Sequence, residues 1–355
     1  MSCLPNTRKA MMMVDVKTIE QKEIPMPDLL ESTDVLVQIK TVGICGSDVN
    51  YFAHGGSTFA KVRYPHILGH EAAGVIVAVG NDVKNLCAGD RVAIEPGVPC
   101  GECDLCKAGK YNLCRDVSFM GIPIYKPYSE GAFVEYTIRP ASWVYKLPDS
   151  VTFEEGAVIE PLSVGMQAVS LCKVQAGQTA LVLGCGPISL CVMLSLRAVG
   201  IHTVFMVDID KPRTEIAKNI GAMYAFNALD DDAKRVIMDE TSGKGVDLVF
   251  DTTNYMPLVN DSFNYLNKAG EVVLIGVPHD DYISIHYREL FMRQATLHTS
   301  FRYANQYPSA IRLVSQGVIP IGKIITHSFA FDRTQEAFEL ALNRGVPTEK
   351  VVVTL

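Results

Sequence analysis

The chain has 355 residues, of which 48% are apolar and 20% are charged, and its formal net charge is −7. This length predicts two domains, and the composition excludes a disordered or collagen-like chain. Because acidic residues outnumber basic ones and no basic stripe is present, we expect no nucleic-acid partner. The ten cysteines are too few for a disulfide scaffold. Their positions therefore carry more information than their number.

The N-terminal part of the chain predicts a β-rich domain. Its apolar run at residues 11–14 ends at Asp15 and is shorter than the core of a signal peptide, which favours a cytoplasmic protein. Short alternating runs separated by Gly, Pro and Asp turns are typical of strands. They cover residues 34–41, 74–79, 91–94 and 132–138.

The middle of the chain predicts a parallel α/β sheet, because β-branched runs alternate with helical stretches from Thr179 to about Ser300. The expected strands are residues 180–183, 204–208, 224–226, 248–251, 272–275 and 296–300. The expected helices are residues 188–199, 212–220, 231–241 and 258–266. Beyond these we expect a helix at residues 333–343 and a last strand at 350–355 that can rejoin the β-rich domain.

One stretch has the length of a membrane span. Residues 174–196 include 23 positions without a charge. Its middle, however, reads Gly184-Cys185-Gly186-Pro187. A buried strand, a glycine turn and a buried helix fit this pattern better, so we expect no membrane partner.

The strongest chemical signal is the run Cys100-x2-Cys103-x2-Cys106-x7-Cys114. Four thiolates this close in sequence can form a tetrahedral shell around Zn²⁺. An iron–sulfur cluster, disulfides and unrelated buried cysteines are the alternatives. The bacterial iron–sulfur spacing is tighter at its fourth cysteine and is followed by proline. We expect a structural zinc, because four cysteine ligands leave no position for a substrate.

A second set of possible metal ligands is scattered along the chain. Cys45 and Ser47 lie in a glycine-bounded turn, His70 and Glu71 follow a glycine, and Glu160 lies at the expected domain junction. Each signal is weak alone, since a lone cysteine is more often buried filler and a lone histidine is more often an ordinary core or surface residue. Together they offer sulfur, nitrogen and oxygen ligands, as a catalytic zinc with an open position requires.

The third signal is a glycine turn, Gly184-Cys185-Gly186-Pro187-Ile188-Ser189, between an expected strand and an expected helix. This is the context of a dinucleotide-binding turn. At the third position of the motif, where glycine or alanine is usual, this chain has Ser189, so the packing of the helix on the strand must accommodate a hydroxyl. The next strand ends on Asp208, 22 residues beyond Gly186, where a carboxylate can bind the ribose hydroxyls and repel a 2′-phosphate. We therefore expect NAD rather than NADP.

These motifs resemble those of the zinc-dependent medium-chain dehydrogenases, in the branch that oxidises polyols such as sorbitol and xylitol. The resemblance covers nearly the whole chain and is carried by residues 42–51, 69–80, 89–114, 156–165, 182–188 and 301–303. It implies an α/β fold with two domains. Residues 1–160 and 301–355 would form a GroES-like β-rich catalytic domain, and residues 161–300 a Rossmann domain, a doubly wound parallel sheet that binds NAD. An active-site cleft between them and a homotetramer or dimer are also implied.

The resemblance assigns roles to individual positions. It implies that Cys45, His70 and Glu71 ligate a catalytic zinc and that Glu160 binds this zinc or its water. The implied substrate contacts are Tyr51, Phe119, Glu160, Arg302 and Tyr303, with ordinary packing an equal alternative for Phe119. The implied cofactor contacts are Gly184, Gly186, Pro187, Ile188, Asp208, Arg213, the turn of residues 276–278 with Gly276 and Val277, Ser300 and Arg302. Two zinc ions per chain are expected, one catalytic and one structural.

The expected reaction is the reversible, NAD-dependent oxidation of a secondary hydroxyl of a polyol to the ketose. Ser47 would begin a proton relay, but the histidine that often follows three residues later in the family is Asn50 here. Cys45 and Glu71 are both anionic, which predicts a weaker Lewis acid and leaves a role for a base such as Glu160.

Other activities remain open at this point. A threonine, sugar-phosphate or simple secondary-alcohol dehydrogenase would share the architecture, and Lys61, Arg63 and Arg302 could reach a phosphate. A non-enzymatic protein on the same fold is a further alternative. The presence of all the expected zinc ligands weighs against it.

Overall fold

The computed structural model describes residues 4–27, 31–56, 61–124, 127–230, 232–277, 281–343 and 345–355. Backbone contacts divide the chain into two units. Unit 1 comprises Met1–Glu160, Tyr307–Gln316 and Ile325–Leu355, and unit 2 comprises Pro161–Gln306 and Gly317–Ile324. Among the described residues, no helix combines the length and apolarity that crossing a membrane requires.

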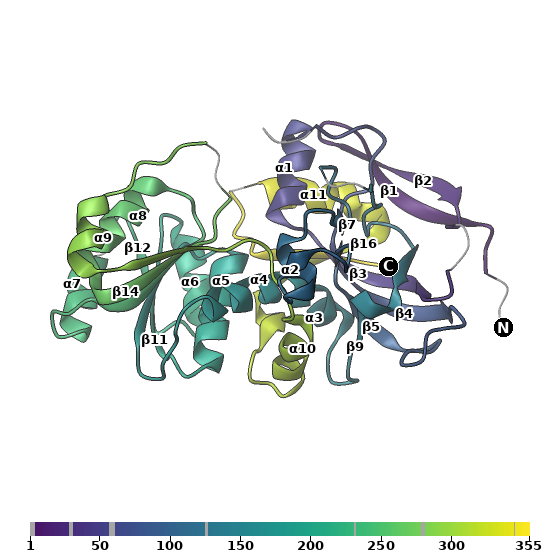
Figure 1. Ribbon diagram of the computed structural model, residues 1–355. Coiled ribbons are helices and arrows are strands. Elements are labelled where there is room, and N and C mark those ends of the chain that lie inside the picture. Colours follow the sequence, from purple (N-terminus) through teal and green to yellow (C-terminus); the bar gives the residue numbers. More distant parts are fainter. Residues whose placement is uncertain are drawn as a thin grey trace. The chain divides into compact units, whose positions relative to one another are not determined.

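Unit 1 is built on a mixed sheet with the strand order β16-β17-β3-β4-β5-β9, and β8 pairs with β3 beside this path (Figure 1). The strands are β3 (Asp34–Gly43), β4 (Glu71–Val79), β5 (Arg91–Ile94), β8 (Tyr136–Pro140), β9 (Val144–Lys146), β16 (Ile325–Ala330) and β17 (Lys350–Thr354). The strands predicted in this part overlap β3, β4, β5 and β8. The hairpin of β1 (Thr7–Asp15) and β2 (Thr18–Pro25) was not predicted.

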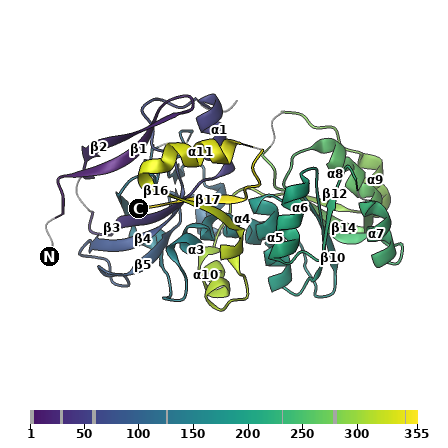
Figure 2. The same cartoon turned by 180° about the vertical axis from the view of Figure 1, so that it is seen from behind.

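The last strand confirms the predicted return of the chain to the β-rich part. Strand β17 pairs antiparallel with β3, so that Val352 lies opposite Gly43, and parallel with β16 (Figure 2). The predicted helix before it is observed as α11 (Thr334–Leu342). Its Phe338 packs on Phe52 and Phe133, with ring centroids 5.2 and 5.3 Å apart. The C-terminal segment is therefore part of the core of unit 1.

Unit 2 contains a parallel sheet with the order β12-β11-β10-β13-β14-β15, which is the Rossmann arrangement. The strands are β10 (Thr179–Leu183), β11 (Thr203–Asp208), β12 (Tyr224–Asn227), β13 (Val246–Asp251), β14 (Leu266–Leu274) and β15 (Thr296–Thr299). The helices are α4 (Ile159–Ser170, beginning in unit 1), α5 (Pro187–Ala198), α6 (Lys211–Ile220), α7 (Ala233–Glu240), α8 (Met256–Ser262) and α9 (Tyr287–Arg293). All six predicted strands overlap observed ones, and the charge-free stretch forms β10 and α5.

The predicted helix at residues 258–266 is wrong at its C-terminal end. Helix α8 stops at Ser262, a 3-10 turn follows at Phe263–Tyr265, and Leu266 already pairs with Val246 as the first residue of β14. Pairing with a buried neighbouring strand outweighs the local helical pattern here. Of the predicted helix at 231–241, Asp231 lies outside the described residues.

The observed units differ from the expected division at residue 301. Residues 301–306 and Gly317–Ile324 group with unit 2. The backbone N–H of Ala304 donates to Gln167 Oε1 at 3.1 Å, and the 3-10 turn Ile321–Ile324 contacts α5. Between these segments, α10 (Tyr307–Ser315) belongs to unit 1, and the Tyr307 hydroxyl donates to the carbonyl of Ile94 at 2.8 Å.

The buried Glu95 ties the cysteine-rich lobe of unit 1 to its sheet. It directly follows β5, and its carboxylate accepts hydrogen bonds from Tyr111 of the lobe at 2.9 Å and from Tyr145 of β9 at 2.8 Å. Burial raises the pKa of Glu95 to about 7, although the two tyrosine hydrogen bonds act to lower it.

This raised pKa predicts a loss of stability as pH rises. The folded chain holds the Glu95 proton up to about pH 7, whereas the unfolded chain loses it near its ordinary pKa of 4.5. Between these values the folded state binds more protons, so the free energy of unfolding falls with rising pH, by about 3 kcal/mol for this group. Urea unfolding across this range should show a flatter profile for Glu95→Gln. A slope identical to that of the wild type would contradict the assignment.

Candidate functional site

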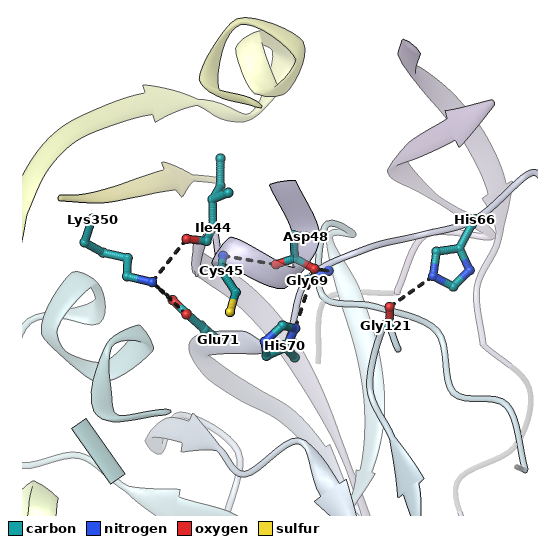
Figure 3. Close-up of polar contacts among 9 residues, drawn as sticks. All are labelled: Ile44, Cys45, Asp48, His66, Gly69, His70, Glu71, Gly121 and Lys350. Atoms are coloured by element: carbon teal, nitrogen blue, oxygen red, sulfur yellow. Dashed lines mark hydrogen bonds and ion pairs between the residues drawn. The ribbon is translucent and has the colours of Figure 1, made fainter. Parts of the chain in front are cut away.

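The scattered metal ligands of unit 1 come together in the structure. Cys45 directly precedes α1 (Gly46–His54), and His70 and Glu71 lie at the start of β4. One ligand atom from each of the three lies within 4.8 Å of the others, and Figure 3 shows the Cys45 thiol directed toward His70 and Glu71. A Cβ at Gly43 would lie 2.1 Å from Glu71 Oε2, so only glycine leaves room for this carboxylate.

Asp48 organises this group, and the sequence reasoning did not identify it. The side chain is fully buried and accepts hydrogen bonds from the backbone N–H groups of Cys45 at 3.1 Å and Gly69 at 3.2 Å. Its Oδ1 lies 3.6 Å from His70 Nδ1. An acid three residues after a helix-capping position is the available signal, because such a side chain can reach back to the backbone at the start of the helix.

Asp48 also changes the proton affinity of His70. Burial lowers the pKa of this imidazole, but Asp48 and Cys45 raise it, and the net result is a pKa well above the usual value. The buried Nδ1 has no partner within hydrogen-bonding distance. A buried imidazole between a carboxylate and a thiol is a suitable donor for a cation, since metal-bound histidines commonly have a carboxylate behind them.

Lys350 is the second residue that sequence reasoning missed. Its Nζ lies 2.7 and 2.9 Å from the two oxygens of Glu71 and donates to the carbonyl of Ile44 at 3.1 Å (Figure 3). Lys350 and Glu71 are 2% and 0% exposed, so the pair is shielded from solvent. No sequence signal connects them, because 279 positions separate the two residues. The negative charge of Glu71 is therefore balanced by a buried cation, a feature that the sequence analysis did not include.

The remaining catalytic candidates of unit 1 differ in how they relate to this group. Glu160 is buried in the first turn of α4 but is not part of the group of Cys45, His70 and Glu71. Ser47 is half-buried, and Asn50, at the position of the expected relay histidine, is exposed. The Phe119 ring packs edge-on against His70 with centroids 5.8 Å apart.

The predicted substrate contacts are divided between the units. Tyr51, Phe119 and Glu160 belong to unit 1, whereas Arg302 and Tyr303 belong to unit 2. The Arg302 guanidinium lies 4.5 Å from the centroid of the Phe301 ring, and Tyr51 and Tyr303 are buried. The possible phosphate ligands Lys61 and Arg63 are exposed.

The four clustered cysteines fit a zinc ion. The sulfur atoms of Cys103 and Cys106 are 3.5 Å apart, those of Cys100 and Cys114 are 3.5 Å apart, and those of Cys100 and Cys106 are 3.9 Å apart. Tetrahedral coordination at a zinc–sulfur distance of about 2.3 Å places sulfurs about 3.8 Å apart. Hydrogen bonds within the cluster lower the pKa of Cys103, whereas burial and the neighbouring thiols raise that of Cys106.

The glycine turn of unit 2 has the expected form. Gly184 has φ of +102°, and a Cβ there would lie 2.7 Å from Thr252 Oγ1 and 2.8 Å from Ser189 Oγ. These two hydroxyls hydrogen-bond at 2.7 Å, so the fully buried Ser189 is accommodated as expected. Gly186 directly precedes α5, and Pro187 is its first residue. Ile188, the second residue of α5, is half-buried.

Asp208 ends β11 beside this turn. Its Oδ2 accepts the backbone N–H of Cys185 at 2.7 Å, and its Oδ1 accepts that of Asp210 at 2.9 Å. Arg213 lies close to Gly186, since a Cβ on the glycine would be 3.4 Å from the guanidinium, and it is 3.7 Å from the Asp210 carboxylate.

The other predicted cofactor residues follow the next strands of the sheet. A Cβ at Gly276 would lie 2.7 Å from the backbone nitrogen of Asn254. Val277 is exposed, and Pro278 of the same predicted turn lies outside the described residues. The Ser300 N–H donates to the carbonyl of Leu274 at 2.8 Å, just beyond β15.

Comparison with known proteins identifies the family. Residues 31–149 match the model of the alcohol dehydrogenase GroES-like domain, and residues 187–316 match the zinc-binding dehydrogenase model. The chain belongs to the zinc-dependent medium-chain dehydrogenases. The fold predicted from sequence, a GroES-like part and a Rossmann-like part, is thereby confirmed.

Two curated relatives and one solved structure illustrate the similarity. The chain is 36% identical over 350 residues to a sorbitol dehydrogenase from Bacillus subtilis (strain 168), covering 99% of this chain and 98% of the relative. It is 37% identical to L-idonate 5-dehydrogenase from Vitis vinifera, covering 94% and 91%. An Escherichia coli oxidoreductase/dehydrogenase of unknown specificity has a TM-score of 0.91 and 33% identity, covering 98% of this chain and 99% of that structure.

The buried pair of Lys350 and Glu71 predicts a large stability effect. Lys350→Met would leave the Glu71 carboxylate buried without its cation, so we expect the free energy of unfolding to fall by about 3–5 kcal/mol. The exposed pair of Lys22 and Glu20 offers a matched control, and Lys22→Met should cost less than about 1 kcal/mol. Urea unfolding measures both. Equal small losses would show that the buried pair does not support the fold.

Proposed function

We propose that the chain is an NAD-dependent zinc polyol 2-dehydrogenase of the sorbitol or L-iditol type, which oxidises a secondary hydroxyl to a ketone and runs reversibly. The observation that carries the proposal is the group of Cys45, His70 and Glu71, which combines sulfur, nitrogen and oxygen donors without closing a four-ligand shell. The curated relatives named above support a polyol as the substrate.

In this proposal Cys45, His70 and Glu71 hold the catalytic zinc, and Glu160 binds it or its water. Asp48 fixes the ring of His70 from behind. When bound, zinc lowers the pKa of a substrate hydroxyl and NAD accepts the hydride.

The proton and charge are handled by side chains around this group. Ser47 receives the hydroxyl proton, and Glu160 serves as the base near the metal. Because Asn50 is an amide and cannot carry a proton as imidazole does, the route beyond Ser47 passes to solvent rather than along α1. Lys350 offsets the charge of Glu71, so Cys45 contributes the uncompensated negative charge.

The proposed substrate contacts are polar where a polyol has hydroxyls. Tyr51, Arg302 and Tyr303 supply hydrogen-bond donors that a simple alkanol could not use, Glu160 supplies an acceptor and Phe119 an apolar wall. A sugar phosphate is the second candidate, since Arg302 is a cation, but Lys61 and Arg63 are exposed and bring no buried positive charge.

Initial rates with sorbitol, xylitol, threonine and 2-butanol, each with NAD and with NADP, test the substrate and cofactor together. We expect the highest kcat/KM for a polyol with NAD. Turnover of threonine or 2-butanol above both polyols would overturn the substrate assignment and leave the dehydrogenase chemistry intact.

The proposed preference for NAD rests on Asp208. Two backbone N–H groups orient its carboxylate at the end of β11, where it would bind the ribose hydroxyls and repel a 2′-phosphate. Asp208→Ala should therefore raise the KM for NAD by about tenfold, the loss of roughly 1.4 kcal/mol, and lower the KM for NADP. A wild-type enzyme that already prefers NADP would contradict this role.

We propose two tightly held zinc ions per chain, one in the four-cysteine lobe and one at Cys45. Cys45→Ser should reduce the zinc content by one equivalent and abolish turnover, with unfolding by urea little changed. Cys103→Ser should also remove one equivalent but lower stability, because a structural zinc contributes to folding. Elemental analysis after extensive dialysis measures the content. Full turnover by Cys45→Ser would remove Cys45 from the catalytic ligand set.

We also propose a homo-oligomer, dimer or tetramer, in the cytoplasm. Strand β15 is the outer strand of its sheet, and the apolar side chains of Phe291, Met292 and Leu297 near it are exposed. An exposed edge strand with apolar neighbours favours pairing with a second copy. In a reducing compartment, the cysteines outside the proposed zinc sites would remain thiols. Sedimentation as a monomer would contradict the oligomer.

A further inference from the structure

Unit 2 contains a group of possible metal ligands that the reaction does not use. Cys172 lies two residues beyond the end of α4, Glu271 lies in β14 and His298 lies in β15. One ligand atom from each lies within 4.8 Å of the others. Three separate elements thus bring a sulfur, an oxygen and a nitrogen donor to one place.

We propose that Cys172, Glu271 and His298 form a cation site of the zinc class that fastens the C-terminal end of α4 to the edge of the parallel sheet. A thiolate, a carboxylate and an imidazole are the donors that Zn²⁺ binds in proteins, and a hard cation such as Mg²⁺ would not select the sulfur. The fourth position would be taken by water.

The carboxylate is already oriented for this role. Glu271 Oε1 accepts the backbone N–H of Lys173 at 3.0 Å, and this leaves Oε2 facing His298 Nε2 at 2.8 Å. Carboxylates that bind metals are commonly held in place by a hydrogen bond from a neighbouring group, and the backbone N–H of Lys173 provides this bond to Glu271. Cys172 is 9% exposed, whereas the side chains of Glu271 and His298 are 16% and 25% exposed, so a cation can reach the group from solvent.

Without a metal, His298 and Glu271 form a hydrogen-bonded pair. In a tetrahedral zinc site the nitrogen and oxygen ligands lie about 3.3 Å apart, so binding would widen this contact by about half an ångström. The cation would bind His298 through Nε2, so the neutral ring would carry its single proton on Nδ1, and the proton of the Cys172 thiol would pass to solvent. Small rotations of two partly exposed side chains supply the movement.

The position in the sheet separates this site from the cofactor turn. Glu271 lies opposite Leu248 in β13, and Leu248 lies opposite Ala180, the second residue of β10. The glycine turn begins beyond Leu183, at the other end of β10. The cation would therefore stabilise unit 2 without taking part in hydride transfer.

Equilibrium dialysis against micromolar zinc, followed by elemental analysis, tests the site. We expect the wild type to take up one equivalent more than it retains after dialysis into zinc-free buffer. Cys172→Ala and His298→Ala should each lose this extra equivalent, with turnover unchanged. Cys87→Ala, which removes an exposed cysteine outside the described ligand groups, should keep it. Cys45→Ser should also keep it, which separates this proposal from the catalytic one.

Thermal unfolding provides the second readout. Added zinc should raise the midpoint of the wild type and of Cys87→Ala but not that of His298→Ala, whose partly exposed side chain can be removed without opening the core. The proposal is wrong if the wild type takes up no extra zinc, or if His298→Ala retains both the extra equivalent and the shift in midpoint.

Discussion

The ion pair between Lys350 and Glu71 connects the C-terminal strand to the group of candidate zinc ligands. Lys350 is the first residue of the last strand, and Glu71 is the first residue of β4. Both charges are buried, and their desolvation is tolerable only because the two groups satisfy each other and the lysine also reaches the carbonyl of Ile44. Since Ile44 precedes Cys45, a single lysine contacts both segments that carry the proposed zinc ligands.

Because unit 2 is inserted into unit 1, the contact of Lys350 with Glu71 forms only when the chain returns to unit 1. The chain leaves unit 1 after Glu160, forms the parallel sheet, and returns so that β17 pairs with β3. Only this return places Lys350 beside Glu71. The ammonium offsets the carboxylate, and Asp48 lies behind His70. The local charge at the proposed metal position is therefore set by residues outside the ligand set, and the Lewis acidity of a bound zinc would be higher than two bare anionic ligands would allow.

Features formed by residues close together in the sequence could be predicted from local sequence patterns. The cysteine spacing predicted a cluster whose sulfurs lie at distances that suit zinc. The glycine pattern predicted a tight turn between β10 and α5, although the hydrogen bond from the Cys185 backbone to Asp208 was not foreseen. The parallel strands were predictable because buried strands have continuous β-branched runs. The start of β14 was missed because pairing of Leu266 with Val246 outweighs the helical pattern. Lys350 was missed because its partner Glu71 is remote in sequence. The grouping of residues 301–306 with unit 2 was not predicted, because it depends on long-range contacts such as that of Ala304 with Gln167.

A crystal structure with anomalous diffraction measured at the zinc absorption edge tests the central claim most directly, because it locates the metal rather than counting it. In crystals grown without added zinc, we predict one anomalous peak among Cys100, Cys103, Cys106 and Cys114 and a second peak bonded to Cys45 and His70, with Glu71 or Glu160 completing the protein ligands. A peak in the cysteine lobe with none at Cys45, in crystals of active enzyme, would contradict the account of a zinc-dependent oxidation.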